Sequence, residues 1–218
     1  MSAVITKLNH LGKFDVPSRF LVKPIADSQK SIRTIGEELG VDNILFGAIF
    51  LDRENIRVDA ELIRARDSST LWRDSLAKNS DEIFAIQSEI AEKIAQALNV
   101  VLSPEERAGL RRKPTENIEA YKLCALGRWF FDKRTDEDCE KAIRSYQSAI
   151  DLDPNYALAY SGLADVHAFM SQSDLMSAGA KAREAAQRAL ALDDSLAEAH
   201  ASLAEIKLEV DWDFEGAE

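Results

Sequence analysis

The spacing of apolar residues changes about halfway along the chain, and the first part has the period of β-strands. Residues 56–62 alternate apolar and charged side chains, as a half-buried strand does. Residues 43–51 are almost continuously apolar and predict a central strand, and residues 71–76 predict a third, shorter one. The connections between them are polar and short. These segments predict an antiparallel meander.

Helical segments surround this meander. A helix is expected from about Ser28 to Leu39, ending at Gly40, because glycine readily adopts the positive φ that ends helices. Ser80 can cap a longer helix with an apolar face. That face comprises Ile83, Ile86, Ile90, Ile94, Leu98 and Val101. A helix of this kind needs a sheet to cover.

Three further segments complete the first domain. Residues 103–106 predict a capping box with Pro104 at the first helical position. Phe14–Val16 is a candidate for one more strand. The basic stretch Arg111–Pro114 marks the boundary, and its cations suit a helix C-terminus better than a phosphate site. Residues 1–113 are therefore expected to form an α+β domain, a mixed sheet with helices on one face.

The second part of the chain repeats itself. Residues 157–166 and 197–206 follow one pattern at an offset of 40, and the helical segments that hold residues 142–149 and 182–189 repeat at the same offset. Ala142, Tyr146 and Ala149 correspond to alanines 182, 186 and 189. Each unit is then a pair of helices that cannot bury its apolar face alone. Residues 114–218 are expected to be all-α, with units at 117–154, 155–194 and a truncated 195–218.

Gly127 followed by Ala142, Tyr146, Ala149 and Pro154 resembles the tetratricopeptide (TPR) repeat. The interval from Gly127 to Ala164 is 37 residues and that from Ala164 to Ala204 is 40. The usual TPR repeat length is about 34 residues. We expect the additional residues in the turns at 132–138 and 171–178. A longer turn leaves the stacked core intact.

Residues 1–113 also resemble a known module. The segments 32–41, 57–63, 71–72 and 83–91 are similar to the TolB amino-terminal-like module. The resemblance implies a place ahead of TPR repeats in bacterial signalling and transcription regulators, behind a winged-helix domain, a nucleotide cyclase or a Ser/Thr kinase. That family has a strand ahead of the helix that Ala3–Leu11 would form. Its apparent absence here predicts an open sheet edge that could recruit another copy.

Charge separates the two parts of the chain. Residues 1–113 carry 17 Lys plus Arg and 17 Asp plus Glu, so the net charge of -11 lies entirely in the repeats. An acidic surface repels phosphate backbones, which argues against nucleic-acid binding. A basic or neutral protein partner fits better, although an acidic face can also be a solvated surface. No apolar run is long enough to span a membrane.

Candidate chemistry is sparse. The glycines form no phosphate-binding loop, and the three histidines are far apart in sequence. His200 occupies the place of Tyr160 in the repeat and is expected to pack. Cys124 and Cys139 are read as free thiols without a neighbouring histidine. The chain is therefore expected to be non-catalytic, with no cofactor and no metal.

The first helices of stacked helix pairs line a groove, and we expect partner binding there. Expected groove residues are Tyr121, Cys124, Arg128, Phe131, Leu158, Ser161, Asp165, Ala168, Glu198, Ala201, Glu205 and Leu208. One arginine among three acids does not suit recognition of a peptide carboxylate. The aromatic run 129–131 is expected to pack between repeats or onto the long helix rather than to anchor a ligand.

The leading hypothesis is a non-catalytic sensory or interaction region of a bacterial signalling protein, with a protein or peptide partner in the groove. The alternatives are an oligomerisation scaffold of the cell envelope and an enzyme with an unrecognised site. The cytoplasm is the default location, or the periplasm if the parent protein has an upstream membrane span.

Overall fold

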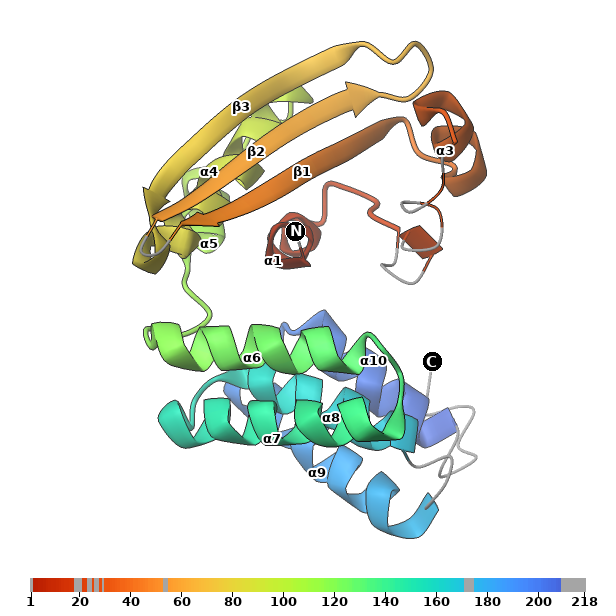
Figure 1. The fold of residues 1–218 in the computed structure, drawn as a ribbon, viewed down its shortest axis with the longest axis vertical. Coiled ribbons are helices and arrows are strands. Elements are labelled where there is room, and N and C mark those ends of the chain that lie inside the picture. The colour runs from red at the N-terminus through yellow and green to blue at the C-terminus, as the bar shows by residue number, and fades with distance from the viewer. Residues whose placement is uncertain are drawn as a thin grey trace. The chain divides into compact units, whose positions relative to one another are not determined.

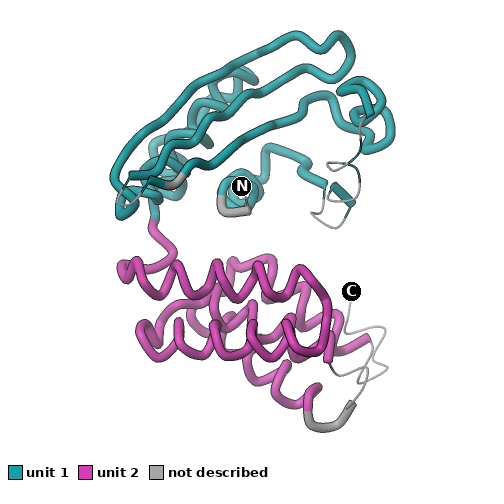
Figure 2. Tube along the Cα trace, in the orientation of Figure 1, with its two compact units in different colours: residues 1–112 teal, residues 113–218 magenta. Residues whose placement is uncertain are grey.

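The computed structural model describes residues 2–17, 21–22, 25, 28, 30–52, 55–170 and 175–208 (Figure 1). The chain divides into two compact units, residues 1–112 and 113–218 (Figure 2). The first unit combines a small antiparallel sheet with helices, and the second is helical.

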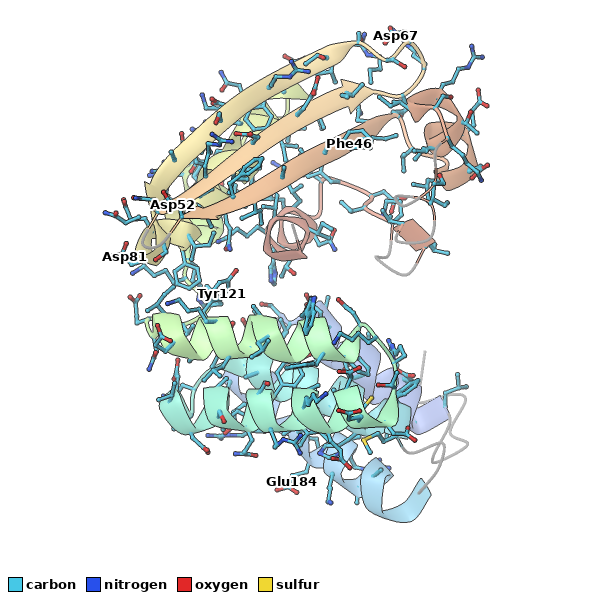
Figure 3. All side chains as sticks on the ribbon, viewed as in Figure 1. Phe46, Asp52, Asp67, Asp81, Tyr121 and Glu184 are labelled. Atoms are coloured by element: carbon cyan, nitrogen blue, oxygen red, sulfur yellow. The ribbon has the colours of Figure 1, made fainter. Side chains whose placement is uncertain are left out.

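The sheet has three antiparallel strands in the order β1-β2-β3. They are β1 (Asn43–Asp52), β2 (Asn55–Arg64) and β3 (Thr70–Asn79). In the turn after β2, the Ser69 backbone N–H donates to the Asp67 carboxylate at 3.1 Å, and Ser68 has φ 56° (Figure 3). The prediction of a mixed sheet is wrong for the part of the chain that is described, where the sheet contains antiparallel pairs alone. β1, predicted to be central, is an edge strand there.

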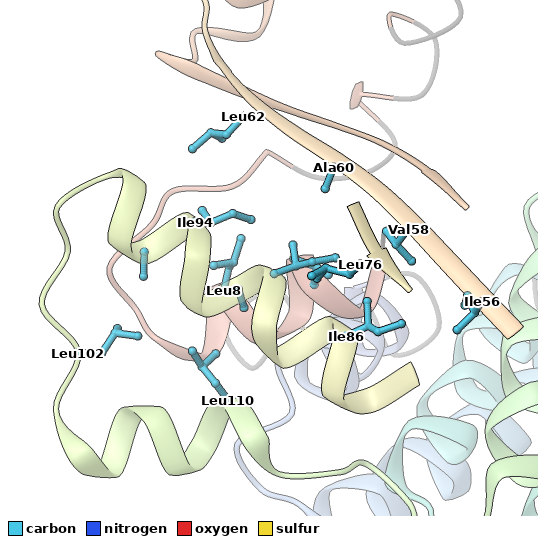
Figure 4. Packing of buried hydrophobic residues seen from close by; sticks show 14 residues of the cluster. Leu8, Ile56, Val58, Ala60, Leu62, Leu76, Ile86, Ile94, Leu102 and Leu110 are labelled. Carbon is cyan, nitrogen blue, oxygen red and sulfur yellow. The ribbon is translucent and has the colours of Figure 1, made fainter. Parts of the chain in front are cut away.

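Alternation along β2 places its apolar residues on the face that helix α4 (Ile83–Ala97) covers. Val58, Ile86, Ile90 and Ile94 are each at most 3% exposed (Figure 4). The helix follows a 3-10 turn, η1 (Ser80–Glu82), and Asn79 rather than Ser80 is the capping residue. The apolar face predicted for α4 extends one residue too far, because it includes Val101. Asn99 has φ 57° beyond the last turn, and Val101 is 84% exposed.

Helices α1 (Ser2–His10) and α5 (Pro104–Arg111) complete this core. The ammonium of Lys7 donates to the Leu110 carbonyl at 2.5 Å and to the Arg112 carbonyl at 3.0 Å. The cation thus satisfies carbonyls at the C-terminal end of α5, where the helix dipole also favours it. Ser103 and Glu106 form the predicted capping box.

Helix α3 (Ile32–Leu39) ends as predicted at Gly40, which has φ 65°. Its start differs from the prediction, because Ser31 caps it by accepting from the Thr34 N–H, and Ser28 lies outside. Phe14–Val16 is not a strand but irregular chain whose apolar side chains pack against the core.

The second unit consists of helices packed as pairs. They are α6 (Ile118–Phe131), α7 (Asp136–Leu152), α8 (Ala157–Met170), α9 (Leu175–Leu192) and α10 (Ala197–Ile206). The Tyr146 ring of α7 lies against Gly127 of α6 and Gly162 of α8. A Cβ at Gly162 would be 2.4 Å from that ring, so the repeat requires glycine there.

The additional residues of the first repeat are not concentrated in a projecting turn. The connection between α6 and α7 comprises residues 132–135, because Asp136–Asp138 form the first turn of α7 with Thr135 as its cap. Part of the expected turn at 171–178 lies outside the described residues, and Leu175 already belongs to α9. The rest of the third unit, residues 209–218, is also outside them.

Candidate protein-binding face

The first helices of the three repeat units, α6, α8 and α10, contribute one continuous surface, because α8 contacts both α6 and α10. We call the expected groove positions on these helices the inner face. Eight of the twelve retain some accessible surface: Ala201, Glu205 and Leu208 are exposed, and Tyr121, Arg128, Leu158, Asp165 and Glu198 are half-buried. The other four, Cys124, Phe131, Ser161 and Ala168, are buried.

Contacts with the following repeat account for the burial of Cys124 and Phe131. The side chain of Cys124 is hydrogen-bonded to that of Tyr156, which precedes α8. Phe131 packs edge-on against Phe169 of α8, with ring centroids 5.9 Å apart. These side chains stabilise the contact between repeats and contribute no surface.

A polar cluster forms where the three helices meet. The Ser202 hydroxyl of α10 donates to the Asp165 carboxylate of α8, linking two repeats. Arg128 of α6 lies within electrostatic range of Asp165 and of Glu198. The cluster therefore contains Arg128 from α6, Asp165 from α8, and Glu198 and Ser202 from α10.

Burial and charge act against each other at Asp165. Burial raises the pKa of its carboxyl group to about 6, although the Ser202 hydrogen bond and the Arg128 cation both lower it. Glu205 and Glu198 add to the rise by repulsion. Asp165 therefore changes charge close to physiological pH.

Arg128 is held as a cation. Burial by itself lowers its pKa, but charge interactions with Tyr146, Cys124, Asp165 and Glu198 outweigh this effect, so the pKa lies above its usual value. Burial keeps the Tyr146 hydroxyl and the Cys124 thiol neutral near pH 7, so the carboxyl groups are the anions among these neighbours. Arg128 thus lies near Asp165 and Glu198, and Glu205 lies near Asp165, so the positions of the inner face carry more acidic than basic side chains.

Ser161 adds a polar group without a described partner. Its side chain is 1% exposed, and its hydroxyl oxygen makes no hydrogen bond among the described residues. Ser161 precedes Asp165 by four residues, so both lie on one face of α8. The buried hydroxyl of Ser161, beside the polar cluster, is therefore able to form a further hydrogen bond.

In the aromatic run at the end of α6, Phe131 is buried and Phe130 packs against the same core, as predicted for both. The expectation is wrong for Trp129, which is 56% exposed, with the Lys133 ammonium 3.7 Å from its ring centroid. The expectation for His200 is also wrong. Its ring is exposed, and Nε2 lies 2.8 Å from the Asp194 carbonyl oxygen, next to the turn before α10.

Two residues of the cluster were not among the sequence-based groove positions. Ser202 follows Ala201 and points to the neighbouring repeat rather than along the expected stripe. Tyr146 belongs to a second helix, and its link to Arg128 depends on its insertion between two glycines. Its place in the repeat pattern gave the signal for its burial but none for its position near Arg128.

Other kinds of site lack support among the residues described. No group of three or more His, Cys, Asp or Glu side chains there could hold a metal ion. Cys124 and Cys139 are free thiols, and burial raises the pKa of both, so neither is activated as a thiolate. Within the same residues, no helix is both long and apolar enough to cross a membrane.

Two basic residues at the C-terminal end of α5 and just beyond it have local partners. The Arg111 guanidinium lies 2.8 Å from the Glu92 carboxylate, and Lys113 lies 2.7 Å from Glu116. The depression along α5 that Arg107, Arg111 and Arg112 help to line is open. These contacts fit the predicted role at a helix end.

Comparison with known proteins supports the repeat assignment. Residues 137–170 match the family model of the TPR repeat, and this stretch comprises nearly all of α7 and the whole of α8. A protein of Rhizobium meliloti (strain 1021) with the name "Putative adenylate cyclase 3" is 26% identical over 160 residues. The match covers 73% of this chain and 27% of the relative, so the chain spans about a quarter of the relative's length.

Proposed function

We propose that this chain is a non-catalytic interaction region of a signalling protein, and that its repeats bind a basic protein segment on the inner face. The observation that carries the proposal is the polar cluster, in which the carboxyl groups of Asp165 and Glu198 lie near Arg128 and Glu205 lies near Asp165. A Lys or Arg side chain of the partner would find charge complementarity there.

The TPR match supports a binding role, because TPR repeats in general mediate contacts between proteins. The relative's name supports a signalling context, since cyclases produce second messengers. We propose that residues 1–113 act as a TolB-like module beside the repeats and that the chain works in the cytoplasm. Catalysis, where the parent protein has it, would lie in another domain.

Binding can be tested on the whole chain with two labelled peptides, one of alternating alanine and lysine and one of alternating alanine and glutamate. Fluorescence anisotropy should show binding of the lysine peptide alone, weakening as salt is added. Glu205→Gln removes one charge from the inner face. It should raise the Kd of the lysine peptide about 5-fold, equivalent to about 1 kcal/mol.

Glu184→Gln is the matched control, because Glu184 is an exposed glutamate on α9, a second helix of the repeat (Figure 3). It changes the net charge equally and should alter the Kd by about twofold or less. Equal losses in both variants would indicate non-specific attraction to an acidic protein and contradict the proposal. Equal binding of the glutamate peptide would do the same.

A second candidate function is assembly into an oligomer, which the uncovered apolar strand β1 favours. It concerns the other unit of the chain and is compatible with partner binding by the repeats.

A further inference from the structure

Strand β1 leaves apolar side chains uncovered on both of its faces. Phe46 and Phe50 are 41% and 46% exposed and lie on the face of the sheet away from the helices. Ile49, beside Val58 on the helix face, is 50% exposed. The sequence pattern of β1 is that of a strand with neighbours on both sides, yet in the described sheet β2 is its sole neighbour.

The two edges of the sheet differ in their protection. β3 carries Arg73, Asp74 and Lys78, charges of the kind that discourage a further strand. β1 has neither a charged residue nor a proline between Asn43 and Asp52. An edge this long and apolar is a template for strand addition.

We propose that β1 pairs with β1 of a second copy of this chain, antiparallel about a two-fold axis at Ala48. Such an axis is perpendicular to the sheet, so each residue faces one on the same side of it. Phe46 then faces Phe50 of the second copy, and Ala48 faces Ala48. The two three-stranded sheets become one of six strands, a common size.

This register makes the strand complementary to itself. The Arg57 guanidinium already lies 4.3 Å from the Phe50 ring centroid, and Phe46 is paired with Glu61 within the sheet. Across the axis a row forms that runs from Arg57 to Phe50, then to Phe46 and Glu61 of the second copy. Aromatic cross-strand pairs and opposite charges both stabilise sheets.

The other face of the sheet fits as well. Ile49 faces Gly47 of the second copy, so a large side chain lies beside a position without one. The net charge of the unit that contains β1 does not oppose this pairing, because residues 1–113 carry equal numbers of basic and acidic side chains. These features favour a second copy over a charged partner strand.

Ala48→Lys tests the register in the whole chain. Ala48 is exposed, so a single copy tolerates the lysine, but the dimer would place two ammonium groups opposite each other. In sedimentation velocity, the wild-type mass should rise with protein concentration toward twice 24.2 kDa. The substitution should raise the dimer Kd about tenfold or more.

Ala77→Lys is the matched control, because Ala77 is an exposed alanine on the same face of β3, at the opposite edge. It should leave the dimer Kd unchanged. Mixing Ala48→Lys with Ala48→Glu protein should restore the dimer, now with opposite charges at the axis. Amide exchange across residues 43–52 should slow as the wild-type concentration rises.

A wild-type chain that stays monomeric at every concentration overturns the proposal and leaves the β1 edge to a strand of another protein. It is also overturned if Ala48→Lys dimerises as tightly as the wild type, or if Ala77→Lys weakens the dimer equally.

Discussion

At the residue scale, Asp165 has its carboxyl group in a position where burial disfavours the ionised form. Its pKa of about 6 lies above the value of about 3.9 for an unfolded chain, so the native state binds the proton more tightly. Ionisation therefore destabilises the native repeats. The contribution of Asp165 to stability is fully present below about pH 4 and is lost as the pH rises through about 6.

Asp165→Asn should remove this pH dependence. The amide stays neutral, and its oxygen can still accept from Ser202. The variant should match the wild type near pH 4 and be more stable at pH 7.5 by about 2–3 kcal/mol. The measurement is the free energy of urea unfolding at a series of pH values.

Asp151→Asn, at an exposed position of α7, provides the control and should change stability by about 0.5 kcal/mol or less at each pH. Arg128, Tyr146, Ser202, Glu198 and Glu205 face the Asp165 carboxyl group and are unchanged in both proteins. Parallel pH profiles for wild type and Asp165→Asn would contradict the prediction.

At the element scale, the packing of α7 between α6 and α8 depends on two glycines. Cβ atoms at Gly127 and Gly162 would lie 3.0 Å and 2.4 Å from the Tyr146 ring. Tyr146 is 1% exposed, so its ring has no room to withdraw. Small residues on first helices therefore set how closely the second helix approaches.

Gly162→Ala should lower the free energy of unfolding of the repeats by about 1–2 kcal/mol. Overpacking costs about 1–3 kcal/mol, and the better helix propensity of alanine returns up to about 1 kcal/mol. Gly109→Ala in α5 has nothing within 4 Å of the new Cβ and should stabilise its helix by about 0.5–1 kcal/mol. Urea unfolding measures both.

Tyr146→Leu supplies a further check by making space at the contact. In that background the cost of Gly162→Ala should shrink, as coupled neighbours show in a double-mutant cycle. An unchanged cost would locate the strain elsewhere.

At the scale of the whole molecule, each compact unit has its own apolar core. One core lies between the sheet and α1, α4 and α5, and the others lie among the repeat helices. A unit with its own core can in principle fold alone. The three-stranded sheet followed by helical repeats is thus an arrangement of two folding units.

Fragments 1–112 and 113–218 should therefore each unfold cooperatively when expressed separately. In the whole chain, Gly162→Ala should shift the thermal transition of the repeats and leave that of residues 1–112 in place. Trp72 is the sole tryptophan of the first unit, so its fluorescence reports that transition in the fragment. A first fragment without a cooperative transition would contradict this division.

Local patterns in the sequence predicted most of the elements. Alternation indicated β2, Gly40 ended α3, the 103–106 box started α5, and the repeat offset indicated the helix pairs. Each of these signals acts within a few residues, through backbone conformation, capping or side-chain period. The errors at Phe14–Val16 and Val101 occurred where short apolar runs have no such signal.

The sequence by itself determined the helical repeats, the meander and the acidic balance of the second unit. Tertiary structure decided which inner-face positions remain accessible, because burial of Cys124, Phe131, Ser161 and Ala168 depends on neighbouring helices. It also brought Ser202 to Asp165 and placed the apolar β1 at an edge. Periodicity gives the side of an element on which a residue lies, whereas only the assembled fold decides what covers that side.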